Sequence, residues 1–203
     1  GTGILGAWAL RGGASKVYAI EASPIARLAQ RFFDANGFGD RVVVLEEDAG
    51  TVQLPEKVDV VISECLGNFA FSDAMFHTVG RFADRWLKPG GRRGPQRVRL
   101  TLQPADGRLF ADPTTFFRNR YDDLDVSAFI HAAERRLEVC AALPPFLRAE
   151  PTVVAEFDPL SRPDSLTLEA DWALPPGKWI SGVVGWFDVD WAPTAPMSTS
   201  PHA

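Results

Sequence analysis

Apolar strand patterns and helical patterns alternate through the first part of the chain, and this alternation most limits the folds that it can adopt. Strand patterns lie at residues 16–20, 41–45 and 58–62, and helical patterns lie at residues 4–10, 25–33 and 75–86. This order predicts a parallel, doubly wound α/β sheet. The 46% apolar content and the net charge of -5 indicate an ordinary globular chain, with no basic excess that would favour nucleic acid.

The sequence pattern changes after residue 91, where Pro, Gly and Asp separate the apolar runs. Strands are predicted at residues 98–102, 152–157, 165–170 and 179–191, and a helix is predicted at residues 126–137. A weakly ordered tail is expected from Pro193 onward. We therefore predict two domains: residues 1–91 form a doubly wound α/β domain, and residues 92–203 form an antiparallel, β-barrel-like domain with a helical insertion.

The first glycines and the first strand together suggest a site for a nucleoside. Gly1 and Gly3 precede a helical pattern, and Glu21 ends the strand that follows. Glycines let the backbone approach a ligand closely, and a carboxylate at that strand end can accept both ribose hydroxyls. Thr2 and Ala22 complete this predicted cofactor site. The alternative is a glycine turn chosen for tight packing, with a solvated glutamate.

Asp48 and Ala49 follow the next strand and are candidates to bind an adenine ring. The Asp48 side chain would accept from the amino group, and the Ala49 amide would donate to a ring nitrogen. A plain acidic turn explains the same residues equally well. These residues do not distinguish a dinucleotide from S-adenosylmethionine.

The apolar run at residues 58–62 predicts a buried strand, and two carboxylates follow it, at Glu64 and, nine positions later, at Asp73. A carboxylate at the carboxyl end of an apolar strand is costly unless it faces a ligand crevice, which is where open α/β sheets bind ligands. The alternative is structural, since Glu64 could cap a loop amide and Asp73 could cap the next helix.

Together with its surroundings, this segment resembles the protein arginine methyltransferases. Their double-glutamate loop reads roughly Ser-Glu-x-x-Gly-Tyr, with a second acid nine positions after the first, and this chain has Ser-Glu-Cys-Leu-Gly-Asn at residues 63–68. Other segments are similar to the family at residues 17–23, 54–59, 87–91, 124–127, 185–189 and 198–201. The resemblance covers nearly the whole chain.

The resemblance implies an S-adenosylmethionine-dependent N-methyltransferase that acts on arginine in a protein or peptide. By motif match, Glu64 is the primary ligand of the guanidinium and Asp73 is the second. A guanidinium stays charged at neutral pH, so two carboxylates can hold it by charge-assisted hydrogen bonds while one nitrogen faces the methyl group. A homodimer is possible, as in the family, while a metal site, a membrane and nucleic acid are not expected.

Several residues depart from the family pattern. Asp73 is shorter than the usual glutamate, and Asn68 stands where tyrosine is common. These departures leave open two alternatives, a methyltransferase of the same fold that acts on a small molecule or another nitrogen, and a binding homologue without activity. Two isolated cysteines favour a reduced, cytoplasmic setting.

The family's central strand and lid helix would precede Gly1, so the sequence reads as an internal fragment of a longer protein. We expect the 203-residue chain by itself to bind S-adenosylmethionine poorly. Isothermal calorimetry tests this, and a tight binding signal would contradict it.

Overall fold

The computed structural model describes residues 1–70, 75–106, 125–134, 144–161, 166–192 and 196–202. The chain forms two compact units. The first unit comprises Gly1–Cys65, Ala74–Gln96 and Pro159–Arg162, and the second comprises Leu66–Asp73, Arg97–Asp158 and Pro163–Ala203. The chain thus leaves the first unit directly after Glu64 and Cys65. A domain boundary at residue 91 stays a prediction.

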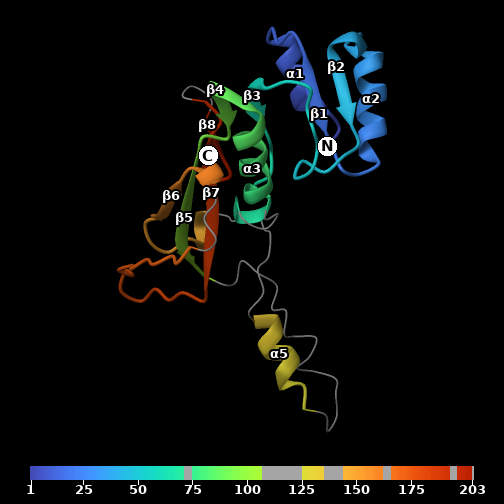
Figure 1. Ribbon diagram of the computed structural model, residues 1–203. Coiled ribbons are helices and arrows are strands. Elements are labelled where there is room, and N and C mark those ends of the chain that lie inside the picture. Colours follow the sequence, from blue (N-terminus) through green and yellow to red (C-terminus); the bar gives the residue numbers. More distant parts are fainter. Residues whose placement is uncertain (71–74, 107–124, 135–143, 162–165, 193–195, 203) are drawn as a thin grey trace. The chain divides into compact units, whose positions relative to one another are not determined.

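The first unit alternates helices and strands in the predicted order (Figure 1). Its elements are α1 (Ile4–Arg11), β1 (Val17–Ile20), α2 (Ile25–Ala35), η1 (Gly39–Arg41), β2 (Val42–Leu45), β3 (Val58–Ile62), α3 (Phe76–Trp86), β4 (Leu87–Gly94) and η5 (Pro159–Ser161). β1 pairs with β2 in parallel, and β3 pairs with β4 in parallel. β4 follows α3 directly and includes the Pro-Gly-Gly stretch at residues 89–91.

The two parallel pairs are separate two-stranded sheets within the described residues. This arrangement leaves β3 partly exposed: Val61 is buried, whereas Val60 and Ile62 are 42% and 45% exposed. The expectation of a buried strand is wrong for these two residues. The physical reason is that β3 has one strand neighbour, β4, in the part of the chain that the structure describes.

Phe33 of α2 is the centre of the apolar cluster between α1, α2 and the β1–β2 pair. Its side chain is fully buried and packs with Ala7, Leu10, Ala29 and Val42. The predicted helical face also includes Ile25 and Leu28, but these side chains are exposed. The buried residues of α2 are instead Ala26, Ala29 and Phe33, so small alanines lie beside the bulky ring in the close-packed interior.

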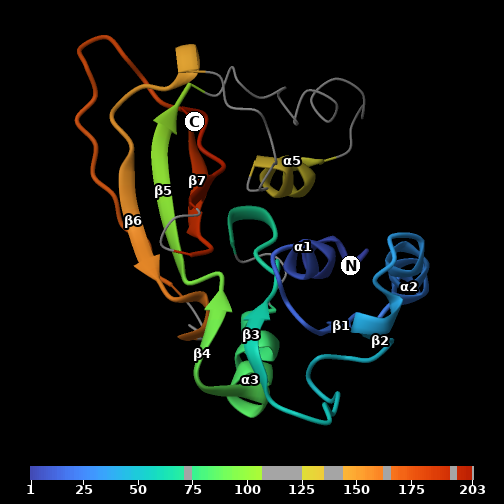
Figure 2. The ribbon, with the colours of Figure 1, turned by 90° about the horizontal axis from the view of Figure 1, so that it is seen from above.

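The second unit is built on an antiparallel sheet of four strands in the order β6-β5-β7-β8. Figure 2 shows β6, β5 and β7 side by side. The strands are β5 (Arg97–Ala105), β6 (Thr152–Phe157), β7 (Gly182–Asp190) and β8 (Pro196–Ser198), and the short helices are η2 (Asn68–Ala70), α5 (Ser127–Glu134) and η4 (Pro144–Phe146). This confirms a predominantly antiparallel second half. α5 falls within the predicted helix at residues 126–137, of which residues 135–137 lie outside the described residues.

Two expectations for the second half are wrong. Residues 166–170 form no strand, and Ser165 lies outside the described residues. The tail, expected to be weakly ordered, contains β8, which pairs with β7. Thr199 explains this order, because its backbone amide donates to the Phe187 carbonyl at 3.1 Å and its hydroxyl accepts from the Phe187 amide at 3.1 Å.

The interior of the second unit lies on both faces of β5 and β7. Val98, Leu100 and Val189 are fully buried, and Trp186 and Phe187 are both nearly buried although they are adjacent in sequence. Adjacent strand residues point to opposite faces, so both faces of β7 are covered at this point. None of the described helices is long and apolar enough to cross a membrane.

Candidate functional site

The structure brings Gly1 and Glu21 together at the predicted cofactor site. The amino group of Gly1 donates to the Glu21 carboxylate, and the Ser23 amide donates to Glu21 Oε1 at 2.8 Å. The Glu21 amide in turn donates to the Leu45 carbonyl at 3.0 Å, which continues the β1–β2 ladder. Glu21 is therefore held at the carboxyl end of β1, beside the glycine turn that starts α1.

Gly3 has a clear packing role at the start of α1. Its φ of 86° lies in the left-handed region, and a Cβ placed there would lie 2.7 Å from Phe33 Cε2. Only glycine tolerates both conditions. The packing alternative therefore accounts for Gly3, whereas nothing lies within 4 Å of a Cβ placed at Gly1. Thr2 follows Gly1 and Ala22 follows Glu21, and both residues are exposed.

Glu21 remains charged well below neutral pH. The hydrogen bond from the Gly1 amino group, followed by those from Ser23, lowers the pKa of Glu21 from an ordinary 4.5 to about 2. The side chain is 23% exposed, so the carboxylate is still accessible to a ligand. An ionised carboxylate accepts hydrogen bonds only, which suits it to a pair of ribose hydroxyls.

The lowered pKa of Glu21 predicts an acid-sensitive contribution to stability. Between about pH 4.5 and 2 the unfolded chain binds a proton at Glu21 that the folded chain does not. The stabilisation is thus complete above about pH 4.5 and is lost as the pH falls toward 2. Urea unfolding of this chain at about pH 5 and about pH 3 should show a smaller loss of stability for Glu21→Gln than for wild type. Equal losses of stability in wild type and Glu21→Gln would contradict the lowered pKa of Glu21.

Asp48 is engaged in its own turn. Its Oδ1 accepts from the Gly50 amide at 2.7 Å, and its backbone carbonyl accepts from the Thr51 and Val52 amides. The Ala49 carbonyl accepts from Arg85 at 3.0 Å. These contacts are those of an acidic turn, which is the structural alternative, although the Asp48 side chain is exposed at the end of β2. An adenine-binding role for Asp48 and Ala49 stays a prediction.

Glu64 lies just beyond β3, where the chain leaves the first unit. The Ser63 amide donates to the Gly94 carbonyl at 3.1 Å, so the β3–β4 ladder extends to the residue before Glu64. Glu64 is exposed, whereas the next two residues, Cys65 and Leu66, are buried. The backbone thus presents Glu64 outward between an ordered strand and a buried pair. Asp73, the predicted second acid, lies outside the described residues.

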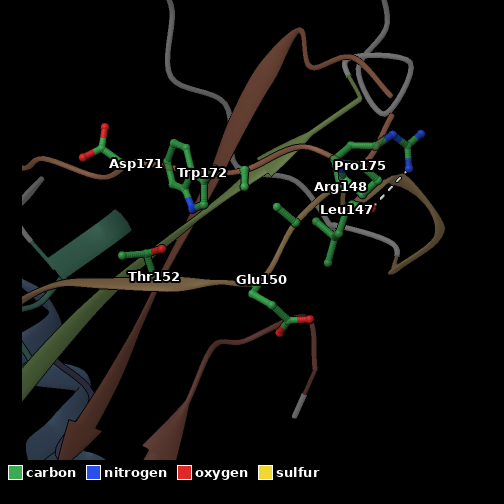
Figure 3. Close-up of a pocket in the computed structure, with 9 residues that line it drawn as sticks. Leu147, Arg148, Glu150, Thr152, Asp171, Trp172 and Pro175 are labelled. Atoms are coloured by element: carbon green, nitrogen blue, oxygen red, sulfur yellow. Dashed lines mark hydrogen bonds between the residues drawn. The ribbon is translucent and has the colours of Figure 1, made fainter. Parts of the chain in front are cut away.

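A pocket of about 570 Å³ lies in the second unit (Figure 3). Its lining comprises Leu147, Arg148, Ala149, Glu150, Thr152, Asp171, Trp172, Ala173 and Pro175, none of which is a predicted site residue. The carboxylates of Glu150 and Asp171 point away from each other (Figure 3). Arg148 donates to the buried Asp106 at 2.6 Å. Arg148 thus pairs with a buried carboxylate, and the two acids of the pocket do not converge on a common ligand position.

Comparison with known proteins decides the family. A family model described as PRMT5 arginine-N-methyltransferase matches residues 4–76. A probable protein arginine N-methyltransferase 6 of Arabidopsis thaliana is 33% identical over 95% of this chain and 46% of its own length. Protein arginine N-methyltransferase 1 of Chlamydomonas reinhardtii is 31% identical over 100% of this chain and 61% of its own length. This chain is a protein arginine N-methyltransferase homologue.

Solved structures of the arginine methyltransferase family share the fold. Arabidopsis thaliana protein arginine methyltransferase 10 matches 99% of this chain and 67% of its own, with a TM-score of 0.84 and 29% identity. A Trypanosoma brucei PRMT1 enzyme-prozyme heterotetramer with AdoHcy matches with a TM-score of 0.81 and 23% identity, which shows the fold alone. The chain spans about half the length of the curated relatives it matches, for example 46% of the Arabidopsis protein.

Proposed function

We propose that the full-length protein transfers methyl groups from S-adenosylmethionine to arginine side chains of protein substrates. The main support is the similarity to arginine methyltransferases over 95% of the chain, which includes both strand ends with their acids, Glu21 and Glu64. S-adenosylmethionine is the methyl donor of this family. The residues present fit it, because Glu21 is an accessible carboxylate, held by the Ser23 amide, beside an open Gly1.

The proposed cofactor site consists of Gly1, Thr2, Gly3, Glu21, Ala22, Asp48 and Ala49. Bound S-adenosylmethionine would supply an electrophilic methyl group. Glu21 would accept from the ribose hydroxyls. Asp48, at the end of β2, is the proposed acceptor for the adenine amino group.

Glu64 and Asp73 are the proposed ligands of the substrate guanidinium. Because a guanidinium has a pKa above about 12, it arrives charged, and the carboxylates hold it by charge-assisted hydrogen bonds. Their main contribution is to orient one nitrogen and to stabilise its charge while the proton leaves late or after transfer. Asp73 is one methylene shorter than a glutamate, which shortens its reach by about 1 Å and makes positioning of this segment critical.

Methyl transfer with product identification tests the proposed function. The full-length protein is incubated with methyl-labelled S-adenosylmethionine and an arginine-rich protein mixture, and the labelled protein is hydrolysed to amino acids. We expect the label in methylated arginine. Label only in another amino acid or in an added small amine would favour the alternative of a different nitrogen. Cofactor binding without any transfer would favour a binding homologue.

Cofactor affinity should depend on Glu21. Glu21→Ala removes a charged acceptor of two hydrogen bonds, so we expect the dissociation constant for S-adenosylmethionine to rise about 10- to 100-fold. Isothermal calorimetry with the full-length protein measures this. Glu169→Ala is the matched control, because Glu169 is an exposed glutamate of the second unit. Equal affinities for wild type and Glu21→Ala would remove Glu21 from the cofactor site.

We further propose the finer fold assignment that the resemblance implies. The parallel pairs of the first unit would belong to one doubly wound sheet of Rossmann type, completed by a strand that precedes Gly1. The antiparallel sheet of the second unit would be part of a substrate-binding β-barrel, and residues 126–137 would form a helical insertion in it. A homodimer and a cytoplasmic location are further proposals for the full-length protein.

A further inference from the structure

The backbone that follows Glu64 makes a turn that is costly for its sequence. Gly67, Phe69 and Ala70 have φ values of 55°, 51° and 63°, in the left-handed region. Glycine adopts this region freely, but phenylalanine and alanine are strained there. Such backbone persists only where surrounding contacts determine it, and it is concentrated at functional sites. Specific contacts must therefore hold Phe69 and Ala70 in place.

The contact that holds Phe69 is with Gly185 in the middle of β7. A Cβ placed at Gly185 would lie 2.6 Å from Phe69 Cε2 and 3.1 Å from Leu102 Cδ2. The Phe69 ring therefore occupies the space that any other residue at position 185 would need. Gly185 lies opposite Leu102 in the β5–β7 register, so the ring sits over two paired strands.

The two unusual features explain each other. A glycine inside a strand weakens it and marks a close approach of another group, and the approaching group here is the Phe69 ring. Leu66 before the turn is 1% exposed and Ala70 at its end is 0% exposed, whereas Asn68 is exposed. The turn is thus attached to the sheet of the second unit by the aromatic contact of Phe69.

We propose that Phe69 is a positioning residue that anchors the turn at residues 67–70, directly after the Glu64 segment, on β7 through the space left by Gly185. In sequence, Glu64 lies three residues before Gly67 and Asp73 lies three residues after Ala70. A fixed turn so close to Glu64 limits the freedom of Glu64. This inference rests on the proposed function of Glu64 and Asp73, and the anchor itself is measurable without that function.

The thiol of Cys65 reports on the anchor independently of catalysis. Cys65 is 3% exposed and adjoins Glu64, so native-state labelling requires local opening of the segment. In a Cys140→Ser background of the full-length protein, with any further cysteines also replaced, Phe69→Ala and Gly185→Ala should each speed labelling by about tenfold or more. Val153→Ala is the control, because Val153 is an exposed side chain on β6.

The double variant separates this contact from general damage to the fold. In Phe69→Ala the ring is absent, so adding Gly185→Ala should change the labelling rate by less than about twofold. Multiplicative effects of the two substitutions, or unchanged labelling in both single variants, would overturn the anchor. Thermal unfolding of each variant confirms that labelling is compared between folded proteins.

Methyl transfer tests the positioning role. If wild type methylates arginine, we expect both single variants to lower kcat by about tenfold or more while the affinity for S-adenosylmethionine stays the same. Unchanged kcat together with faster Cys65 labelling would overturn the positioning role and leave only a structural contact. Absence of transfer by wild type would instead contradict the proposed function, and the labelling result would still decide the anchor.

Discussion

Glu64→Gln is expected to lower the rate of arginine methylation by about 100- to 1,000-fold while the fold is retained. Glutamine has the same shape but no charge, and one of its two oxygen acceptors becomes an NH₂ donor that repels the guanidinium. The guanidinium is then held less well and its charge is less stabilised during transfer. Glu64 is exposed, so the substitution alters no buried side chain.

Labelled methyl transfer at saturating cofactor, by the full-length wild type and the variant, measures this effect. The affinity for S-adenosylmethionine should be unchanged, because Glu64 is proposed to contact the substrate and not the cofactor. Glu47→Gln is the matched control, since Glu47 is an exposed glutamate in the turn after β2. Equal transfer by wild type and Glu64→Gln would remove Glu64 from the mechanism.

Arg148→Met is expected to destabilise the protein by about 3 kcal/mol or more. Arg148 donates to Asp106 at 2.6 Å, and the side chains are 11% and 1% exposed. Methionine keeps most of the apolar volume but removes the positive charge, which leaves a buried carboxylate without this partner. Removing one partner of a buried ion pair costs more than losing an ordinary surface ion pair.

Arg97→Met provides the comparison. Arg97 contacts Asp190 at 2.7 Å and Glu156 at 3.1 Å, but its side chain is 51% exposed. Solvent screens such pairs, so we expect a much smaller loss of stability than for Arg148→Met. Urea unfolding at neutral pH measures both variants. Similar losses for Arg97→Met and Arg148→Met would show that burial of Asp106 does not set the cost, and Asp106→Asn should reduce the effect of Arg148→Met.

Elements were predictable where the local pattern and the environment agree. β3 has the predicted bounds, and α1, β1 and β2 differ from their predicted ranges by one residue at an end. Residues 166–170 have a strand-like pattern but no strand, because a strand requires a hydrogen-bonded partner that the pattern does not specify. β8 is the opposite case, since Thr199 and the β7 edge order a segment whose composition is typical of a loose tail.

The proximity of the predicted cofactor residues Gly1 and Glu21 could also be predicted from the sequence. Gly1 and Glu21 meet because a parallel strand after a glycine turn and helix returns its carboxyl end to the same edge. Asp48 was ambiguous in sequence and remains so, because its carboxylate caps the local turn. Phe69 was missed, and the one available signal was Gly185, an isolated glycine within a predicted strand.

By itself the sequence determined the order of the elements and the acids at two strand ends, because periodicity and strand termination are local properties of the chain. The tertiary structure alone decided which side chains are buried and which distant groups meet. Arg148 pairs with Asp106 across 42 residues, and Phe69 occupies the space beside Gly185. Such contacts depend on how strands distant in sequence are aligned, and the strength of each ion pair depends on the burial that this alignment creates.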